Sequence, residues 1–192
     1  MTRIGTLWVG LLIFGLVLAT TQPVHAAQPF YVELEANQSL IQGEPLNCPP
    51  TGPCTVGGED ISNLIEGFSF DYKVTRVTSG PGTRVLSGEI RIVKRVDKAT
   101  PLLHQALAQN REIDAELRFY RNNPSSGVVE RFHTITISSG RITGIAPWLT
   151  TGVGGGSEAD PFLEAITFSF PLLRFTSDTS ALEFEYSFQS NR

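Results

Sequence analysis

The sequence predicts a mainly β protein: a compact antiparallel β-barrel or sandwich of about seven to eight strands with one short packing α-helix at about Thr100–Asn110. Three observations lead to this fold class. Apolar and polar residues alternate with a period of two along most of the chain, as in half-buried strands. Only one segment after the N-terminal region has apolar residues at helical spacing. Loops rich in proline and glycine separate these runs.

The expected strands follow the alternating runs in chain order. They cover Phe30–Glu35, Ile65–Phe70 continuing to Val74, Leu86–Ile92, Ile113–Phe119, Phe132–Ile142, Ile166–Phe170 and Leu182–Phe188. Within them, one face of each strand is expected to collect the apolar side chains, namely Phe68, Phe70, Tyr72 and Val74; Leu86, Gly88, Ile90 and Ile92; Ile113, Ala115, Leu117 and Phe119; Ile135 and Ile137; Ile166, Phe168 and Phe170; and Leu182, Phe184, Tyr186 and Phe188. Two long segments, Leu40–Asn63 and Pro147–Pro161, are expected to be mobile loops.

The helix is expected to begin at Thr100. The Thr100 hydroxyl is suited to capping the first turn, and Pro101 fits the first helical position, where a missing N–H costs nothing. An apolar stripe then follows at helical spacing, made of Leu102, Leu103, Ala106 and Leu107. A stripe of this width predicts one short helix packed on a sheet.

The N-terminal residues predict a secretory signal. Arg3 precedes an apolar run from Leu7 to Ala19, and small residues occupy the positions that a signal peptidase needs, Val24 and Ala26. The alternative is a retained membrane anchor, but thirteen helical residues extend only ~20 Å, against ~30 Å of hydrocarbon core. We expect cleavage after Ala26, a secreted or periplasmic location, and no stable membrane insertion after removal of residues 1–26.

Residues 27–192 are expected to form a single domain with one core. The segment up to Ala26 carries Arg3 and no acidic residue, so its removal moves the formal net charge from −4 to −5. An acidic chain without a basic, aromatic-rich stripe argues against a nucleic-acid partner. The densest cationic cluster contains Arg91, Lys94, Arg95 and Lys98, and it is expected to be a solvated face beside the helix.

Cys48 and Cys54 are the only cysteines, and in an exported chain they are expected to form a disulfide. Closing this seven-residue loop is worth roughly 2.4 kcal/mol in the chain-entropy model, which would steady one loop. A redox or zinc role is the alternative. The spacing is not Cys-x-x-Cys, and only His104 and His133 follow the signal segment, so no metal and no cofactor are expected.

The sequence assigns no catalytic residue. Gly152–Gly156 lacks the Gly-Lys-Ser/Thr ending of a phosphate loop, and no Gly-x-Ser-x-Gly or His-Glu-x-x-His motif is present. His104 and His133 are expected at the edges of packed faces. The strand carboxylates recur at every second position, as on a solvated sheet face: Glu33, Glu35, Asp71, Glu164, Glu183 and Glu185. A pair of glycosidase acids among them stays open, but we expect no enzyme, and a secreted hydrolase is the least favoured alternative.

The helix region resembles the haemolysin-coregulated protein (Hcp) family, the tube protein of type VI secretion. The residues that carry the resemblance lie between two expected strands: Asp97, Lys98, Ala99, Thr100, Pro101, Leu102 and Ala106. The flanking segments follow the family's order, with Gly88–Ile92 before the helix and Ala115–Arg121 and Glu164–Phe170 after it. The resemblance covers nearly all of the chain after Ala26.

The resemblance implies a structural protein that assembles with itself into hexameric rings, which stack into a tube, carry effectors and meet a spike protein. It also implies that Leu40–Asn63 reaches a neighbouring subunit, although the proline-rich cysteine insert departs from the family pattern. A signal peptide conflicts with tube assembly in the cytoplasm. A secreted or periplasmic binding module that keeps the Hcp fold without the tube role is therefore the alternative.

Overall fold

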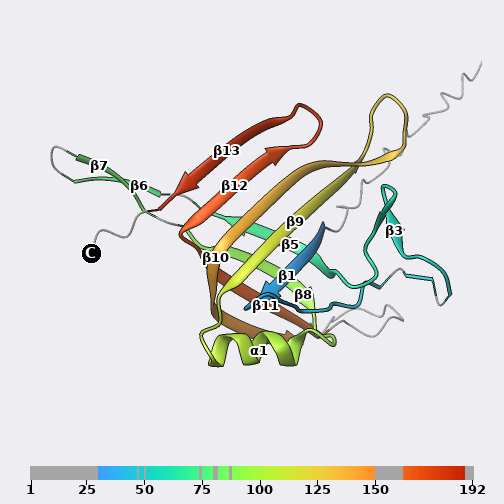
Figure 1. Ribbon diagram of the computed structural model, residues 1–192, viewed down its shortest axis with the longest axis horizontal. Helices are drawn as coiled ribbons and strands as arrows, with labels where there is room; N and C mark the ends of the chain where they lie inside the picture. Colours follow the sequence, from blue (N-terminus) through green and yellow to red (C-terminus); the bar gives the residue numbers. More distant parts are fainter. Residues whose placement is uncertain are drawn as a thin grey trace, which may run out of the picture.

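The computed structural model describes residues 30–46, 48–49, 51–73, 75–79, 82–86, 88–149 and 162–188 (Figure 1). The expected signal segment, Val74 and the glycine-rich stretch Gly152–Gly156 lie outside the described residues. The described strands are β1 (Phe30–Ala36), β2 (Ser39–Leu40), β3 (Thr55–Val56), β4 (Glu59–Asp60), β5 (Ile65–Tyr72), β6 (Thr75–Ser79), β7 (Gly82–Leu86), β8 (Ile90–Arg95), β9 (Ile113–Asn122), β10 (Val129–Leu149), β11 (Phe162–Ser169), β12 (Leu172–Ser177) and β13 (Leu182–Ser187). The helix α1 spans Thr100–Ala108.

The main sheet closes on itself. Its antiparallel order is β11-β8-β5-β1-β9-β10, and β10 also pairs with β11, so six strands form a barrel. The other half of β10 pairs with β12, which pairs with β13, so this hairpin extends the sheet beyond the barrel (Figure 1). The mainly β prediction is confirmed: a closed antiparallel barrel with additional strands and one short helix.

The barrel is filled by one hydrophobic core. Its fully buried residues come from inward-facing strand positions and from α1, and include Leu34, Ile65, Ile92, Leu103, Leu117, Ile137, Ile166 and Phe168. The period-two faces predicted for β9, β11 and the centre of β10 all point into this core. The helix lies across one end of the barrel (Figure 1), where it contacts β10.

The apolar stripe of the helix is narrower than predicted. Leu103 and Ala106 are buried, and Leu107 packs against the core, but Leu102 is 42% exposed. The helix also ends at Ala108 instead of Asn110, and Asn110 adopts a left-handed conformation with φ 50°. A left-handed residue cannot continue a right-handed helix, which explains the earlier end.

Three predicted strand faces are wrong in part. A β-bulge between Gly67 and Ser69 turns Phe68 outward, whereas Phe70 still packs against the core. An extra residue on one strand shifts the alternation beyond it. Leu86 belongs to β7, which pairs only with β6 in a separate two-stranded sheet, so Leu86 and Gly88 do not share a strand with Ile90.

The third error concerns the last strand. Leu182 and Phe184 are 70% and 56% exposed, while Tyr186 and Phe188 on the same face pack against the core. The β12–β13 hairpin therefore covers the barrel with one end only. Its other end leaves two large apolar side chains in solvent.

Candidate functional site

A buried ion cluster links the helix to the barrel wall. The Lys94 ammonium donates to Asp97 Oδ1 and Glu164 Oε1, both at 2.7 Å, and to the Arg95 carbonyl oxygen at 2.5 Å. Lys94 and Glu164 are fully buried, on β8 and β11, and the Asp97 side chain is only 8% exposed. All three ammonium protons thus have acceptors, which a buried cation requires.

Thr100 completes this ion cluster. Its hydroxyl donates to Glu164 Oε1 at 2.6 Å and accepts the Asp97 N–H at 3.1 Å. The capping role predicted for Thr100 is therefore wrong. Ala99 occupies the N-cap position, and the Asp97 carboxylate accepts the Ala99 N–H at 2.9 Å. The Asp-Lys-Ala-Thr run forms a turn, closed by the Thr100 N–H donating to the Asp97 carbonyl oxygen, that leads into the helix. Its Asp97 and Thr100 side chains link the helix to the barrel through the ion cluster.

The remaining family-motif residues divide between the core and the surface. Ala99 and Ala106 are buried, which lets the helix approach the strands closely. Lys98, Pro101 and Leu102 are exposed. The motif as a whole therefore builds the start of α1 and its attachment.

Two surface predictions fail at this cluster. Lys94 was expected in a solvated cationic face, and Glu164 on a solvated acidic face, yet neither side chain is exposed. Arg91 and Lys98 are solvated as predicted. The alternating pattern could have predicted the burial of Lys94, because Lys94 lies on the same strand face as the core residues Ile90 and Ile92.

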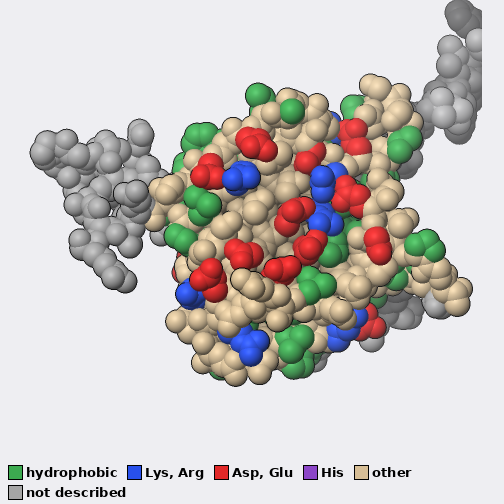
Figure 2. Space-filling view, in the orientation of Figure 1, with side chains coloured by type: hydrophobic (Ala, Val, Ile, Leu, Met, Phe, Trp, Pro, Cys, Tyr) green, Lys and Arg blue, Asp and Glu red, His purple; other side chains and the backbone are tan. Residues whose placement is uncertain are grey.

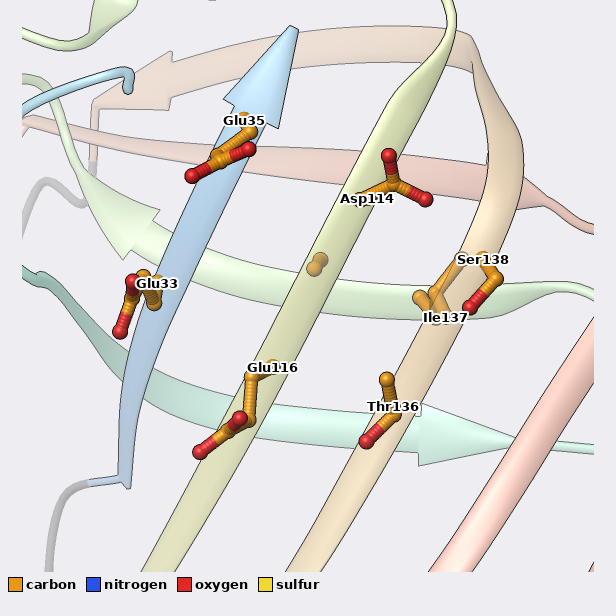
Figure 3. Close-up of a pocket in the computed structure, with 8 residues that line it drawn as sticks. Glu33, Glu35, Asp114, Glu116, Thr136, Ile137 and Ser138 are labelled. Atoms are coloured by element: carbon orange, nitrogen blue, oxygen red, sulfur yellow. The ribbon is translucent and has the colours of Figure 1, made fainter. Parts of the chain in front are cut away.

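Acidic side chains gather over the outer face of β1 and β9 (Figure 2). Figure 3 shows Glu33 and Glu35 on β1 and Asp114 and Glu116 on β9, projecting to the same side of the sheet around a shallow pocket. The register places Glu33 opposite Glu116 and Glu35 opposite Asp114. Like charges in direct cross-strand positions repel each other unless cations compensate them.

Two arginines supply part of that compensation. Arg118 on β9 pairs with Glu33 and, at 2.7 Å, with Glu116. Arg131 on β10 lies 3.6 Å from Glu116 and 3.2 Å from Glu59. The predicted solvated acidic face is thus a mixed ionic surface, and among the described residues Glu35 has no cationic side chain within ion-pair distance.

A disulfide-bearing segment packs on the same outer face. The structure joins Cys48 and Cys54 by a disulfide. The next residues form the β3–β4 hairpin, which turns at Gly57 and Gly58 with φ of 59° and 83°. Two consecutive positive φ values fit a two-residue hairpin turn. The Leu40–Asn63 segment thus contains a hairpin that the loop prediction missed, although the Gly-Gly pair could have indicated it.

His104 and His133, the two histidines that the structure describes, do not assemble into a catalytic group. His133 lies between the rings of Phe119 and Phe175, with centroids 5.9 and 6.0 Å away, and His104 is exposed on α1. Within the described ranges, no group of three or more His, Cys, Asp or Glu side chains is placed to hold a metal ion. No helix in those ranges combines the length and apolar character needed to cross a membrane.

Three tyrosines are expected to make the stability of the folded state decrease at alkaline pH. Burial raises the pKa of Tyr31 and of Tyr72 to about 12, and burial together with the Glu59 carboxylate raises the pKa of Tyr120. The folded state therefore holds these protons more tightly than the unfolded chain, in which a tyrosine titrates near 10. Their contribution to stability is complete below about pH 10. For Tyr31 and Tyr72 it is lost as the pH rises through about 12. Urea unfolding midpoints should fall across this range, and Tyr72→Phe should reduce the fall.

The closed six-strand barrel and the helix anchored to it define a compact β-barrel domain. A family model described as "Type VI secretion system effector, Hcp" matches residues 41–176. The chain therefore belongs to the Hcp family of type VI secretion systems. No curated protein matches the sequence.

Solved structures show the same fold. An Hcp protein of known crystal structure matches with a TM-score of 0.69 at 16% identity, covering 86% of this chain and 100% of that one. The secreted protein Hcp3 from Pseudomonas aeruginosa matches with a TM-score of 0.61 at 21% identity, covering 84% and 99%. Hcp1 from the E. coli EAEC 042 pathovar matches with a TM-score of 0.66 at 14% identity, covering 85% and 100%.

Proposed function

We propose that this chain is a structural protein of the type VI secretion type, which assembles with itself into hexameric rings. The observation that carries the proposal is the family match across residues 41–176, in a fold that covers the full length of an Hcp protein. The motif residues that carried the sequence resemblance build the helix anchor of this fold. Stacking of rings into a tube, effector transport and contact with a spike protein are parts of the same proposal. In this role the protein acts through surfaces and not through a catalytic centre.

The monomer has surfaces that suit such association. A closed ring of identical subunits needs two different, complementary patches on each subunit. β13 is the last strand of its sheet, and no other described strand pairs with its outer edge. Leu182 and Phe184 are exposed on it. Unpaired edges and exposed apolar side chains favour pairing with another chain.

We propose that only the outer side of the Leu40–Asn63 segment contacts a neighbouring subunit. Its β3–β4 hairpin returns to its own barrel, where Ile61 and Leu64 are buried against Tyr31 and Tyr120. Any contact that this segment makes with a neighbour therefore uses its outer side, including Leu46, which is 54% exposed.

A variant without the cysteine insert tests this ring proposal. Replacing residues 48–54 by a short Gly-Ser linker should change the oligomer seen by light scattering and leave the far-ultraviolet β spectrum unchanged. The double variant Cys48→Ala/Cys54→Ala is the matched control for loss of the bond, because it keeps every residue position of the segment. An insert deletion with the wild-type oligomer would exclude this segment from the ring contact.

The second candidate is an exported binding module with the Hcp fold and no tube role. The disulfide favours it, since such bonds persist in oxidising compartments. We propose in either case that residues 1–26 are removed and that the mature protein is secreted or periplasmic.

The export proposal predicts the mass of the mature protein. Intact mass spectrometry of exported material should show a chain that begins at Ala27 and lacks two hydrogens relative to the dithiol form. The reason is that signal cleavage and cysteine oxidation both follow export. Two alkylatable thiols or an intact Met1 in the purified native protein would contradict it.

A further inference from the structure

A second, smaller core lies outside the barrel wall. It consists of the buried residues Tyr31, Cys54, Ile61, Leu64 and Tyr120, with Cys48, Val56 and Val129 packed against it. Tyr31 on β1 and Tyr120 on β9 point away from the barrel interior, as their alternation with the core residues requires. The segment that carries the two cysteines therefore covers two aromatic side chains of the barrel wall.

Few contacts hold this cover in place besides its apolar side chains. The Tyr120 hydroxyl donates to Glu59 Oε2 at 3.0 Å, and Arg131 lies 3.2 Å from the same oxygen. The Ile61 N–H donates to the Cys54 carbonyl oxygen at 2.8 Å and closes the hairpin. β3 and β4 contribute only two paired residues each. A two-stranded hairpin of this size is not stable by itself in water.

The disulfide ties the start of this hairpin, at Cys54, to Cys48 in the preceding segment. Cys54 directly precedes the first residue of β3 and is itself part of the second core, at 5% exposure. The bond lowers the conformational entropy of the open segment, since Cys48 and Cys54 stay together when the hairpin leaves the wall. For a closed loop of seven residues this corresponds to roughly a 60-fold smaller opening equilibrium constant. The barrel itself does not share this dependence, because its six strands pair around a closed sheet that does not include the disulfide segment.

We propose that the Cys48–Cys54 disulfide is a redox latch that holds the β3–β4 hairpin over Tyr31 and Tyr120. A dithiol reductant transfers two electrons and two protons to the bond. The sulfur–sulfur bond breaks, two cysteine thiols form, and the reductant becomes a cyclic disulfide. The hairpin then opens, and the outer face of β1 and β9 gains two exposed tyrosines. The exported, oxidised chain keeps this face covered. This inference concerns the monomer and does not depend on ring assembly.

Amide hydrogen exchange on the full chain, with and without dithiothreitol, tests the latch. The reporters are the Ile61 and Leu64 amides, which donate to carbonyl oxygens within the hairpin segment. Reduction should speed their exchange by at least ten-fold and leave the β1–β9 ladder, such as Val32 and Leu117, unchanged. Tyrosine ionisation followed at 295 nm should shift toward lower pH in the reduced form, because Tyr31 and Tyr120 lose their burial.

The variant Cys48→Ala/Cys54→Ala is the matched control. It should exchange like the reduced wild type, and dithiothreitol should not change it further. Unchanged Ile61 and Leu64 exchange after reduction would show that the apolar contacts and Glu59 hold the hairpin without the bond, and would overturn the proposal. Equal acceleration in the β1–β9 ladder would also overturn it, because the bond would then stabilise the whole fold and would not act as a local latch.

Discussion

Lys94→Met is expected to destabilise the protein by about 3–5 kcal/mol, the usual cost of removing one partner of a buried ion pair. Lys94 is the only cation that contacts Glu164 in the described structure, and both side chains are fully buried. Loss of Lys94 leaves the carboxylates of Glu164 and Asp97 without the cation that each of them contacts. Urea unfolding followed by circular dichroism measures the change.

Lys98→Met is the matched control for this prediction. Lys98 lies four residues further along the chain and is exposed, so its replacement should change the unfolding free energy by less than about 0.5 kcal/mol. The double variant Lys94→Met/Glu164→Leu should recover part of the loss, because no unpaired carboxylate then remains at position 164. A Lys94→Met protein as stable as Lys98→Met would mean that the ion cluster does not exist as described.

Leu103→Asp is the second substitution with a large expected effect. Leu103 has no exposed surface and packs in the main core, so a carboxylate there would be buried without a partner. The expected loss is about 4 kcal/mol, from the missing apolar contacts and the buried charge together. Leu107→Asp should cost less, because Leu107 is only partly buried.

Leu102→Asp provides the control on the same turn of α1. Leu102 is 42% exposed, so its charged replacement should shift the melting temperature by no more than a few degrees. Equal melting temperatures for Leu102→Asp and Leu103→Asp would show that the helix face is assigned wrongly.

The sequence was most informative where the alternation was regular. β9 is a central strand, and its residues Ile113, Ala115 and Leu117 pair with β1 on one side and β10 on the other. The apolar face of such a strand can be buried only in the barrel core. The helix was predictable for a similar reason, because Leu103 and Ala106 lie on one helix face and are buried together. Local pattern and tertiary packing agree at these positions.

The errors occurred where a tertiary feature changed a local pattern. The bulge beside Phe68 depends on how β5 pairs with β8, which no residue near Phe68 encodes. Leu182 and Phe184 follow a strand pattern, but the hairpin that carries them extends past the barrel. Their exposure depends on where the barrel ends, which local periodicity does not specify.

The candidate site was less predictable than the fold. The motif around Asp97 was visible, but its partner Glu164 lies 70 residues after Lys94 in the sequence. A charged residue on the core face of an alternating strand is the signal that such a partner exists, and both Lys94 and Glu164 show it. The β3–β4 hairpin was hidden in a loop because its strands are only two residues long.

Native mass spectrometry of the oxidised mature protein tests the ring proposal most directly. A closed ring of identical subunits gives one discrete species, so the proposal predicts a mass six times that of the subunit measured under denaturing conditions. The species should persist as the protein is diluted through the micromolar range. A strictly monomeric protein at all of these concentrations would contradict the ring and favour the exported binding module.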